Sequence, residues 1–297
     1  MIIVTGAAGQ LGTDVVRELE KRNIPHIGID IADVDITDEV EIKNYFIEIN
    51  GKYDIQSVIH CAAYTAVDKA EDEPELCYKV NVVGTENIVK LCQEIGAEMI
   101  YISTDYVFDG KGDVPYEIDS PKIPISVYGK SKLAGEKVVI ESLEKYYIVR
   151  ISWVFGITGN NFVKTMLKLS ETRDEINVVA DQIGSPTYTV DLAKLLCDMI
   201  FSEKYGEYHA TNEGFCSWAE FATEIMQINN ANVADNSKNY DVKICKINPI
   251  STEEYPTKAV RPKNSRLSKS SLDENGFTRL PTWQDALERF INQLDNM

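Results

Sequence analysis

Short apolar runs alternate with helix-like stretches through the first half of the chain. In the helix-like stretches, which include 74–92 and 123–143, apolar positions recur at helical spacing. The apolar runs have the length of buried strands, and they cover residues 1–5, 26–30, 57–61, 100–104 and 147–152. Such alternation is typical of a parallel sheet with helices on both faces. We therefore expect an α/β protein of the doubly wound, Rossmann type.

The second half of the chain is less regular. Two helical stretches, near 190–201 and 218–228, are separated by loops. This change predicts two units, a dinucleotide-binding Rossmann core over residues 1–155 and a smaller α/β substrate lobe over 156–297. Part of the second unit, about 176–212, is expected to return to the core.

A glycine-rich turn joins the first apolar run to the first helical stretch. Its glycines are Gly6, Gly9 and Gly12, a variant of G-x-G-x-x-G in which the first interval is one residue longer. Glycines permit a tight turn and a close approach to a pyrophosphate, whose charge is met by amides at a helix N-terminus. The position between strand and helix favours a dinucleotide site, with Gln10 and Leu11 inside it, over a simple tight turn.

An acidic residue ends the second apolar run. Asp30 lies 18 residues beyond Gly12, about the distance at which a carboxylate binds the adenosine ribose hydroxyls. No arginine follows Asp30 directly, so we expect NADH to be preferred while NADPH stays open. The third apolar run is followed by a turn of small residues. This turn would let the dinucleotide lie against the backbone, but a purely structural turn explains the small residues equally well. The further candidates for contact with the dinucleotide are Asp35, Ile36, Ala62, Ala63 and Tyr64.

Tyr128 and Lys132 stand four residues apart in a helical stretch, so their side chains share one helical face. A phenol has a pKa of about 10, and an adjacent ammonium makes proton exchange near neutrality easier. Thr104 ends an apolar run, at the sheet edge where α/β proteins bind ligands. A tyrosine and a lysine at this spacing are also common as a solvent-exposed pair. The spacing alone therefore does not decide between a catalytic role and an ordinary surface position.

Composition narrows the classes of function. The chain has 297 residues, of which 44% are hydrophobic and 26% charged, and its net charge of −17 disfavours nucleic acid as a partner. We find no leader pattern and no apolar run long enough for a membrane span. Six cysteines without C-x-x-C pairs or neighbouring histidine clusters argue against a zinc site and a disulfide framework, and they predict reduced thiols in a cytoplasmic protein.

Taken together, these motifs resemble the extended short-chain dehydrogenase/reductase superfamily. Within it, the chain is most similar to the dTDP-4-dehydrorhamnose reductase family. The resemblance spans most of the chain. The stretches that carry it are Ala62–Glu71, Ser103–Gly110, Tyr128–Glu136, Arg150–Gly156, Asn161–Val163 and Asp181–Thr187.

The resemblance implies reduction of the C4 keto group of dTDP-4-dehydro-L-rhamnose to dTDP-L-rhamnose. Nicotinamide gives the hydride and Tyr128 the proton, while Lys132 lowers the pKa of the phenol and holds the ribose, and Thr104 hydrogen-bonds the developing oxyanion. Tyr128 and Lys132 thus also count as cofactor-binding residues. The family and the loop-rich context of Asn161 and Arg261 together give the candidate substrate-binding residues, which are Thr104, Asp105, Tyr106, Trp153, Asn161 and Arg261.

Other members of the superfamily keep two alternatives open. One is a related nucleotide-sugar reductase or epimerase, and the other is a non-catalytic partner similar to the regulatory beta subunit of methionine adenosyltransferase. The presence of Thr104, Tyr128 and Lys132 favours an enzyme. The family also implies Mg²⁺ held by glutamates in some dimers, but no acids here can be assigned to it. Both a monomer and a homodimer therefore remain open.

Overall fold

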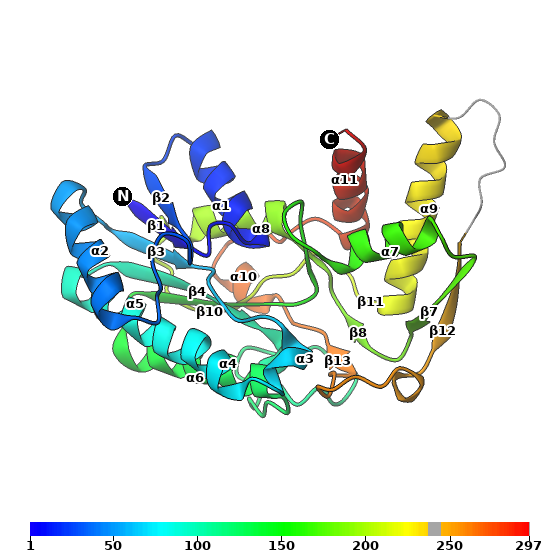
Figure 1. The fold of residues 1–297 in the computed structure, drawn as a ribbon, viewed down its shortest axis with the longest axis horizontal. Helices are drawn as coiled ribbons and strands as arrows, with labels where there is room; N and C mark the ends of the chain where they lie inside the picture. The colour runs from blue at the N-terminus through cyan, green and yellow to red at the C-terminus, as the bar shows by residue number, and fades with distance from the viewer. Residues whose placement is uncertain (237–244, 297) are drawn as a thin grey trace.

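A six-stranded parallel sheet forms the centre of the computed structural model, which describes residues 1–236 and 245–296 (Figure 1). The strand order is β10-β5-β4-β3-β1-β2, so the winding reverses between β1 and β3. In an open α/β sheet, ligands bind outside the carboxyl ends of the strands at such a reversal. The strands are β1 (Ile2–Thr5), β2 (His26–Ile29), β3 (Ser57–His60), β4 (Glu98–Thr104), β5 (Tyr146–Ile151) and β10 (Gly206–His209).

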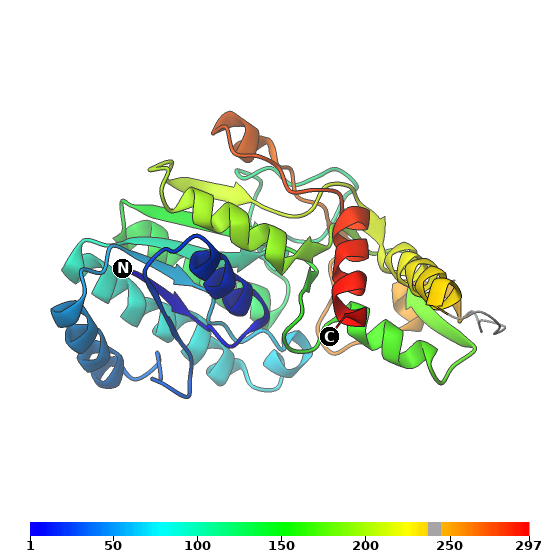
Figure 2. The same cartoon turned by 90° about the horizontal axis from the view of Figure 1, so that it is seen from above.

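Helices cover both faces of this sheet, which confirms the predicted doubly wound α/β fold (Figure 2). On one face lie α1 (Gln10–Lys21) and α8 (Thr189–Met199). On the other lie α2 (Glu39–Lys52), α5 (Thr85–Ile95) and α6 (Val127–Ser142). Because both faces are covered, β1 and β3 are buried at every residue, which is why they read as unbroken apolar runs.

Capping side chains set where the helices begin. Asp38 accepts hydrogen bonds from the amides of Val40 and Glu41 at the start of α2, and Ser126 accepts one from Gly129 at the start of α6. The apolar spacing predicted a helical stretch from residue 123, but α6 begins only at Val127. Pro124 explains the difference, since a proline disfavours helical backbone in the residue before it.

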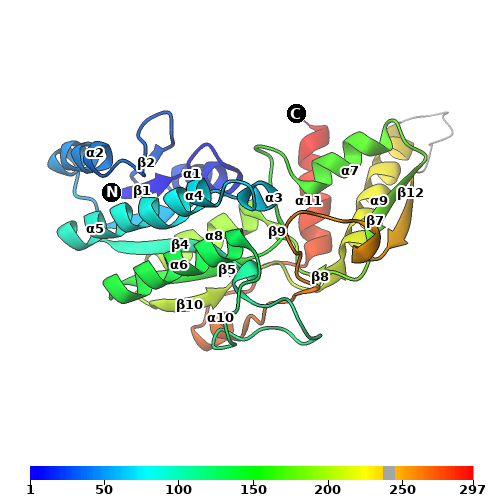
Figure 3. The same ribbon diagram turned by 60° about the horizontal axis from the view of Figure 1, so that its bottom comes forward.

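The predicted helical stretch 74–92 is helical through Ile95, but it is not a regular helix. It consists of α4 (Pro74–Tyr78), the π-helical segment η1 (Lys79–Gly84) and then α5. A π segment inserts an extra residue into the turn and changes which side chains face inward. Here it carries the buried Asn81 next to α6 (Figure 3).

Most of the remaining elements, though not α3, η2 and α10, form a smaller assembly beside the carboxyl edge of the sheet (Figure 1). An aromatic core that includes Phe155, Phe221 and Phe290 holds it together. The predicted helices near 190–201 and 218–228 are present, whereas α7, α11 and the short strands lie where the sequence pattern was read as irregular. The division at residue 155 stays a prediction, although β10 and α8 pack with the central sheet.

The bounds of those elements are α3 (Val67–Ala70), η2 (Asp105–Val107), β6 (Val154–Phe155), α7 (Phe162–Ser170), β7 (Glu175–Val179), β8 (Ile183–Gly184), β9 (Thr187–Tyr188), β11 (Cys216–Ser217), α9 (Trp218–Asn236), β12 (Lys246–Ile250), η3 (Thr252–Glu254), β13 (Asn264–Ser265), α10 (Ser270–Glu274) and α11 (Trp283–Asp295). Cys61, Cys77, Cys92, Cys197 and Cys216 are free thiols. Within residues 1–236 and 245–296, no helix is long and apolar enough to span a membrane.

Candidate active site

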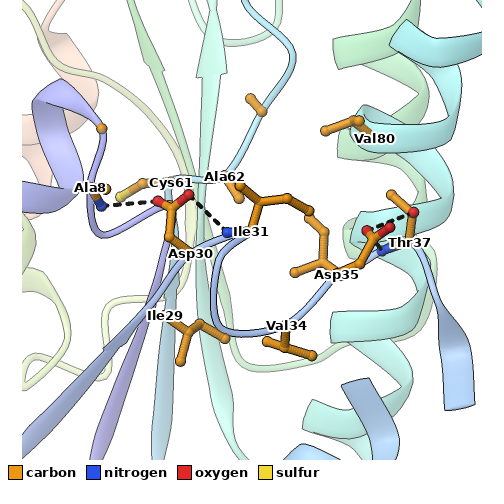
Figure 4. A pocket seen from close by; sticks show the side chains of 14 residues that line it. Ala8, Ile29, Asp30, Ile31, Val34, Asp35, Thr37, Cys61, Ala62 and Val80 are labelled. Atoms are coloured by element: carbon orange, nitrogen blue, oxygen red, sulfur yellow. Dashed lines mark hydrogen bonds between the residues drawn. The ribbon is translucent and has the colours of Figure 1, made fainter. Parts of the chain in front are cut away.

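Two adjoining pockets lie where the carboxyl ends of the strands meet. The Asp30 pocket, of about 450 Å³, extends from the glycine turn along β2 (Figure 4). The Tyr128 pocket, of about 580 Å³, extends from the same turn toward β4, α6 and the smaller assembly. The pockets share Gly6, Gly9, Cys61 and Ala63, so together they make one continuous cleft across the turn.

The glycine turn fits tightly against its surroundings. Gly6 has φ +66°, and a Cβ at Gly12 would lie 2.1 Å from the Gly6 carbonyl oxygen. Substitution at either position would therefore displace the backbone. The following helix α1 has no side-chain cap and no acidic residue in its first turn. Its amides and its dipole are thus directed at the cleft without a competing carboxylate, as a bound pyrophosphate requires.

Asp30 ties the glycine turn to the end of β2. Its carboxylate accepts hydrogen bonds from the amides of Ala8 at 2.9 Å and of Ile31 at 2.8 Å (Figure 4). The pocket around it contains the carboxylates of Asp30 and Asp35, and the described lining residues include no lysine or arginine. The Asp30 pocket is therefore acidic where a ribose would be bound.

Asp35 is engaged locally. Its Oδ1 accepts from the Thr37 hydroxyl at 2.7 Å and from the Thr37 amide at 2.8 Å (Figure 4). The hydroxyl hydrogen bond lowers the pKa of Asp35 below its ordinary value. This turn leads into α2, so Asp35 has a structural role in addition to lining the pocket.

Helix α6 and strand β4 bring Tyr128, Lys132 and Thr104 to the Tyr128 pocket. Tyr128 is 9% exposed and Lys132 only 2%. Burial raises the pKa of the phenol, and a hydrogen bond with Thr104 acts in the opposite direction. Tyr128 is accordingly a protonated donor. Burial also lowers the pKa of the Lys132 ammonium to about 7, and its Nζ lies 4.0 Å from the ring centroid of Tyr101.

Asp105 adds a buried acid beside Thr104. One of its oxygens accepts from the Thr104 hydroxyl at 2.9 Å, while Oδ2 makes no hydrogen bond of normal geometry in the described part of the chain, although the Ser265 hydroxyl lies near enough to act on the pKa of this acid. Burial raises the pKa of Asp105 to about 6. A hydroxyl of a ligand in this pocket could satisfy that oxygen.

Trp153 and Asn161 come from the smaller assembly. Trp153 has φ +51°, unusual for a residue with a side chain, and its indole stacks on Trp218 at 3.6 Å between centroids. It therefore both lines the pocket and belongs to the aromatic core. The Asn161 amide donates to Gln10 Oε1 at 3.1 Å, which joins α7 to the glycine turn.

Arg261 closes the other side of the pocket. Its guanidinium donates to the Tyr106 hydroxyl at 3.1 Å and forms an ion pair with Asp68. The Tyr106 ring in turn meets Tyr128 edge to face, with 5.6 Å between ring centroids. Asp68 stands in a stretch that carried the family resemblance, but no local pattern pairs it with Arg261, 193 positions away.

Most predicted residues are gathered in this cleft. In the Asp30 pocket these are Gly6, Gly9, Asp30, Asp35, Ile36, Ala62 and Ala63. In the Tyr128 pocket they are Gly6, Gly9, Gln10, Leu11, Gly12, Ala63, Thr104, Asp105, Tyr106, Tyr128, Lys132, Trp153, Asn161 and Arg261.

Tyr64 lies outside both linings, and its hydroxyl donates to Glu73 at 2.9 Å.

The Tyr64 backbone is held by Asn81, a residue that the sequence analysis did not include in the site. Asn81 accepts from the Tyr64 amide and donates to the Tyr64 carbonyl, and it also donates to Ser131 on α6. The π segment thus fixes the turn after β3 against the helix of Tyr128 and Lys132. The only sequence signal was an asparagine among apolar neighbours.

Known proteins share this arrangement. The model of the family described as RmlD substrate binding domain matches residues 1–296. The chain belongs to this family. Proteins named dTDP-4-dehydrorhamnose reductase, the family expected from the motifs, are among the relatives and solved structures that match this chain. The predicted family is therefore confirmed.

Three RmlD relatives align over nearly the whole chain. The spore coat polysaccharide biosynthesis protein SpsK of Bacillus subtilis (strain 168) is 40% identical over 292 residues, covering 98% of this chain and 97% of its own. The structure of a dTDP-4-dehydrorhamnose reductase from Clostridium acetobutylicum ATCC 824 is 41% identical, with a TM-score of 0.91 and 99% of both chains covered. That of Bacillus anthracis str. Ames, in complex with NADP, is 42% identical, with a TM-score of 0.89 and 98% of both chains covered.

Proposed function

We propose that this RmlD family member catalyses the NAD(P)H-dependent reduction of the C4 keto group of dTDP-4-dehydro-L-rhamnose to dTDP-L-rhamnose. The observation that carries the proposal is the convergence of Tyr128, Lys132 and Thr104 in a pocket that opens onto the glycine turn. Relatives named for this reaction match the whole chain, and their reaction needs a proton donor beside a dinucleotide site.

The residues of the cleft fit a nicotinamide dinucleotide. The turn of Gly6 and Gly12 leaves no room for a side chain, and the uncapped N-terminus of α1 suits a pyrophosphate. Asp30 would hold the adenosine ribose, and Lys132 the nicotinamide ribose. When bound, the nicotinamide supplies a hydride.

Tyr128 supplies the proton of the reduction. Because burial keeps its phenol protonated, it can donate to the C4 oxygen as charge develops there. The Thr104 hydroxyl, which donates to Asp105 Oδ1 in this structure, would turn its hydrogen bond to the same oxygen. The carbonyl thereby becomes an alcohol, and the phenolate that remains is stabilised by the Lys132 ammonium. Asp105, with its unpartnered buried oxygen, would accept from a hydroxyl of the sugar.

Arg261 is the proposed ligand of the substrate diphosphate. The described lining of the Tyr128 pocket contains two cationic side chains, Lys132 and Arg261, and Lys132 is assigned to the reacting centre. A diphosphate would compete with Asp68 for the guanidinium, which suits phosphate geometry. Trp153, which also lines this pocket, would contact the sugar or the base.

We also propose that NADH is preferred to NADPH. A 2′-phosphate in the Asp30 pocket would meet carboxylates and no cationic lining residue in the described part of the chain. The Bacillus anthracis relative was solved with NADP, so this preference is a property to be measured for the present chain rather than taken from the family.

The proposed reaction is tested by incubating the protein with NADH and dTDP-4-dehydro-L-rhamnose. We expect NADH oxidation with stoichiometric formation of dTDP-L-rhamnose, identified by NMR. Binding of NADH without reduction of any nucleotide sugar would instead support the non-catalytic partner. Reduction or epimerisation of another nucleotide sugar, with this one left unchanged, would support a related nucleotide-sugar reductase or epimerase.

A further inference from the structure

A third buried side chain continues the stripe of Tyr128 and Lys132 along α6. Glu136 follows Lys132 by four residues, so it lies on the same helical face one turn further on. It is fully buried and belongs to the lining of neither cleft pocket. A buried carboxylate outside the cleft requires partners within the protein.

Strands β4 and β5 provide those partners. Ser103 donates to Glu136 Oε1 at 2.5 Å, and Arg150 donates to Oε1 at 2.8 Å and to Oε2 at 2.7 Å. Ser103 immediately precedes Thr104. Glu136 therefore fastens the helix of Tyr128 and Lys132 to the strand end that carries Thr104.

The charge of Arg150 is shared with a second carboxylate. Glu207 on β10 pairs with the same guanidinium nitrogen that donates to Glu136 Oε2, and it also contacts Lys122 at 3.2 Å. His209 Nε2 lies 3.4 Å from Arg150, and its Nδ1 lies 3.1 Å from the Ser268 carbonyl. A neutral imidazole that accepts from Arg150 and donates to Ser268 satisfies both contacts. Because Glu207 offsets part of the positive charge, Arg150 does not fully cancel the field of Glu136.

Lys132 depends on that field. In the described part of the chain, its ammonium has no hydrogen-bond acceptor or ion-pair partner, and its contact is the ring of Tyr101. Glu136 acts to raise the pKa of Lys132, against the larger effect of burial.

The other titratable groups around Lys132 are uncharged near neutrality. Cys61, after β3, has a pKa raised to about 12 by burial, and burial also raises the pKa of Cys77 on α4. His60 on β3 has a pKa lowered to about 3 by burial. Burial likewise raises the pKa of Tyr101 on β4. Glu136 is thus the charged group among the side chains that act on this ammonium.

We propose that Glu136 is a positioning residue of this site, whose carboxylate keeps Lys132 protonated and holds α6 on β4 so that Tyr128 and Thr104 face the same point. The inference rests on the proposed function, in which Lys132 acts as an ammonium. The Lys132 pKa of about 7 already includes the raising effect of Glu136 against burial, so loss of the Glu136 charge would lower this pKa further and favour the neutral amine at physiological pH.

The test compares the parent with Glu136→Gln and Glu136→Asp. Each protein is titrated with NADH, followed by fluorescence, from about pH 6 to about pH 10, and the pH at which affinity falls is recorded. We expect Glu136→Gln to move this limit, and the matching limit of kcat/KM, down by about one pH unit or more, the size of shift that an opposite charge produces. Glu136→Asp keeps the charge and should restore the parental limit.

Glu207→Gln is the matched control, because it removes the other carboxylate on Arg150. It should lower thermal stability, and it should lower the pH limit by much less than Glu136→Gln, because it acts on Lys132 only by letting Arg150 cancel more of the Glu136 field. An unchanged limit in Glu136→Gln, or an equal shift in Glu207→Gln, would overturn the proposal and leave Glu136 a structural residue. If Glu136→Gln does not fold because Arg150 loses one of its two carboxylate partners, the double variant Glu136→Gln/Arg150→Met must still place the limit below the parental one, by a smaller shift because the opposing positive charge is removed as well.

The binding readout separates this inference from the proposed reaction. A parent protein that binds NADH with a pH limit but reduces no sugar would refute the reaction, while the Glu136 comparison would still be decided by NADH affinity.

Discussion

Replacing Asp30 with asparagine should remove the preference for NADH. The substitution keeps the shape of the side chain and removes the negative charge that a 2′-phosphate would meet. It also damages the turn, because asparagine offers one acceptor oxygen where Asp30 now receives the amides of Ala8 and Ile31. That damage affects both cofactors alike, so the ratio of kcat/KM for NADH and NADPH is the informative quantity.

The expected size follows from the bonds at stake. A hydrogen bond to a charged group contributes about 1 to 3 kcal/mol, and about 1.4 kcal/mol corresponds to a factor of ten. The parental preference for NADH, and its loss in Asp30→Asn, should therefore be roughly 5- to 150-fold. Steady-state kinetics with each cofactor, supported by dissociation constants from calorimetry, gives the ratio.

Asp35→Asn is the control, because it removes a carboxylate from the same pocket that is already engaged by Thr37. We expect Asp35→Asn to change the ratio of kcat/KM by less than about threefold. It removes one negative charge from the pocket, but no hydrogen bond to the ribose is lost. Equal use of both cofactors by the parent would refute the reasoning. So would a ratio that moves as far in Asp35→Asn as in Asp30→Asn.

Three further predictions concern the cofactor, the substrate and stability. Lys132→Met should weaken NADH binding in calorimetry, and an affinity equal to the parent would remove the lysine from the ribose site. Trp153→Ala should weaken dTDP-sugar binding far more than NADH binding, whereas a lower melting temperature without that selectivity would make Trp153 only a core residue. His60 and His209 are kept neutral by burial, with pKa values lowered to about 3, so the unfolded chain binds protons below about pH 6.5 that the folded chain does not. The free energy of unfolding in urea should then fall on acidification from pH 7 to pH 5, by up to about 1.4 kcal/mol per pH unit for each histidine. Asp105, whose pKa is raised to about 6, opposes part of this fall because its folded form takes up a proton first. A free energy of unfolding that does not change with pH would contradict the prediction.

Local patterns were sufficient for the parts of the site that depend on neighbouring residues. Gly6, Gly9 and Gly12 predicted the turn because the strand and the helix that it joins are adjacent in sequence. Tyr128 and Lys132 predicted a shared face because helical periodicity fixes it within one turn. These inferences need no knowledge of distant contacts.

Long-range contacts account for what the sequence pattern did not predict. The pairing of β10 with β5 joins residues about 60 positions apart, and that of Arg261 with Asp68 joins residues 193 apart. The π segment and its Asn81 are defined by contacts to Tyr64 and to α6. None of these partners can be chosen from local propensity, because tertiary packing selects them.

The most direct test of the central claim is the turnover of Tyr128→Phe. The variant loses the proton donor but keeps the ring that packs against Tyr106, so it should bind NADH and dTDP-4-dehydro-L-rhamnose like the parent. Its kcat should fall by about 10² to 10⁴, the usual contribution of a positioned general acid. Tyr147→Phe is the control: it removes a tyrosine hydroxyl on β5 that lies outside the cleft and is hydrogen-bonded with Ser202. This variant should keep parental turnover. A kcat for Tyr128→Phe within a few-fold of the Tyr147→Phe value would contradict the assignment of Tyr128 as the proton donor.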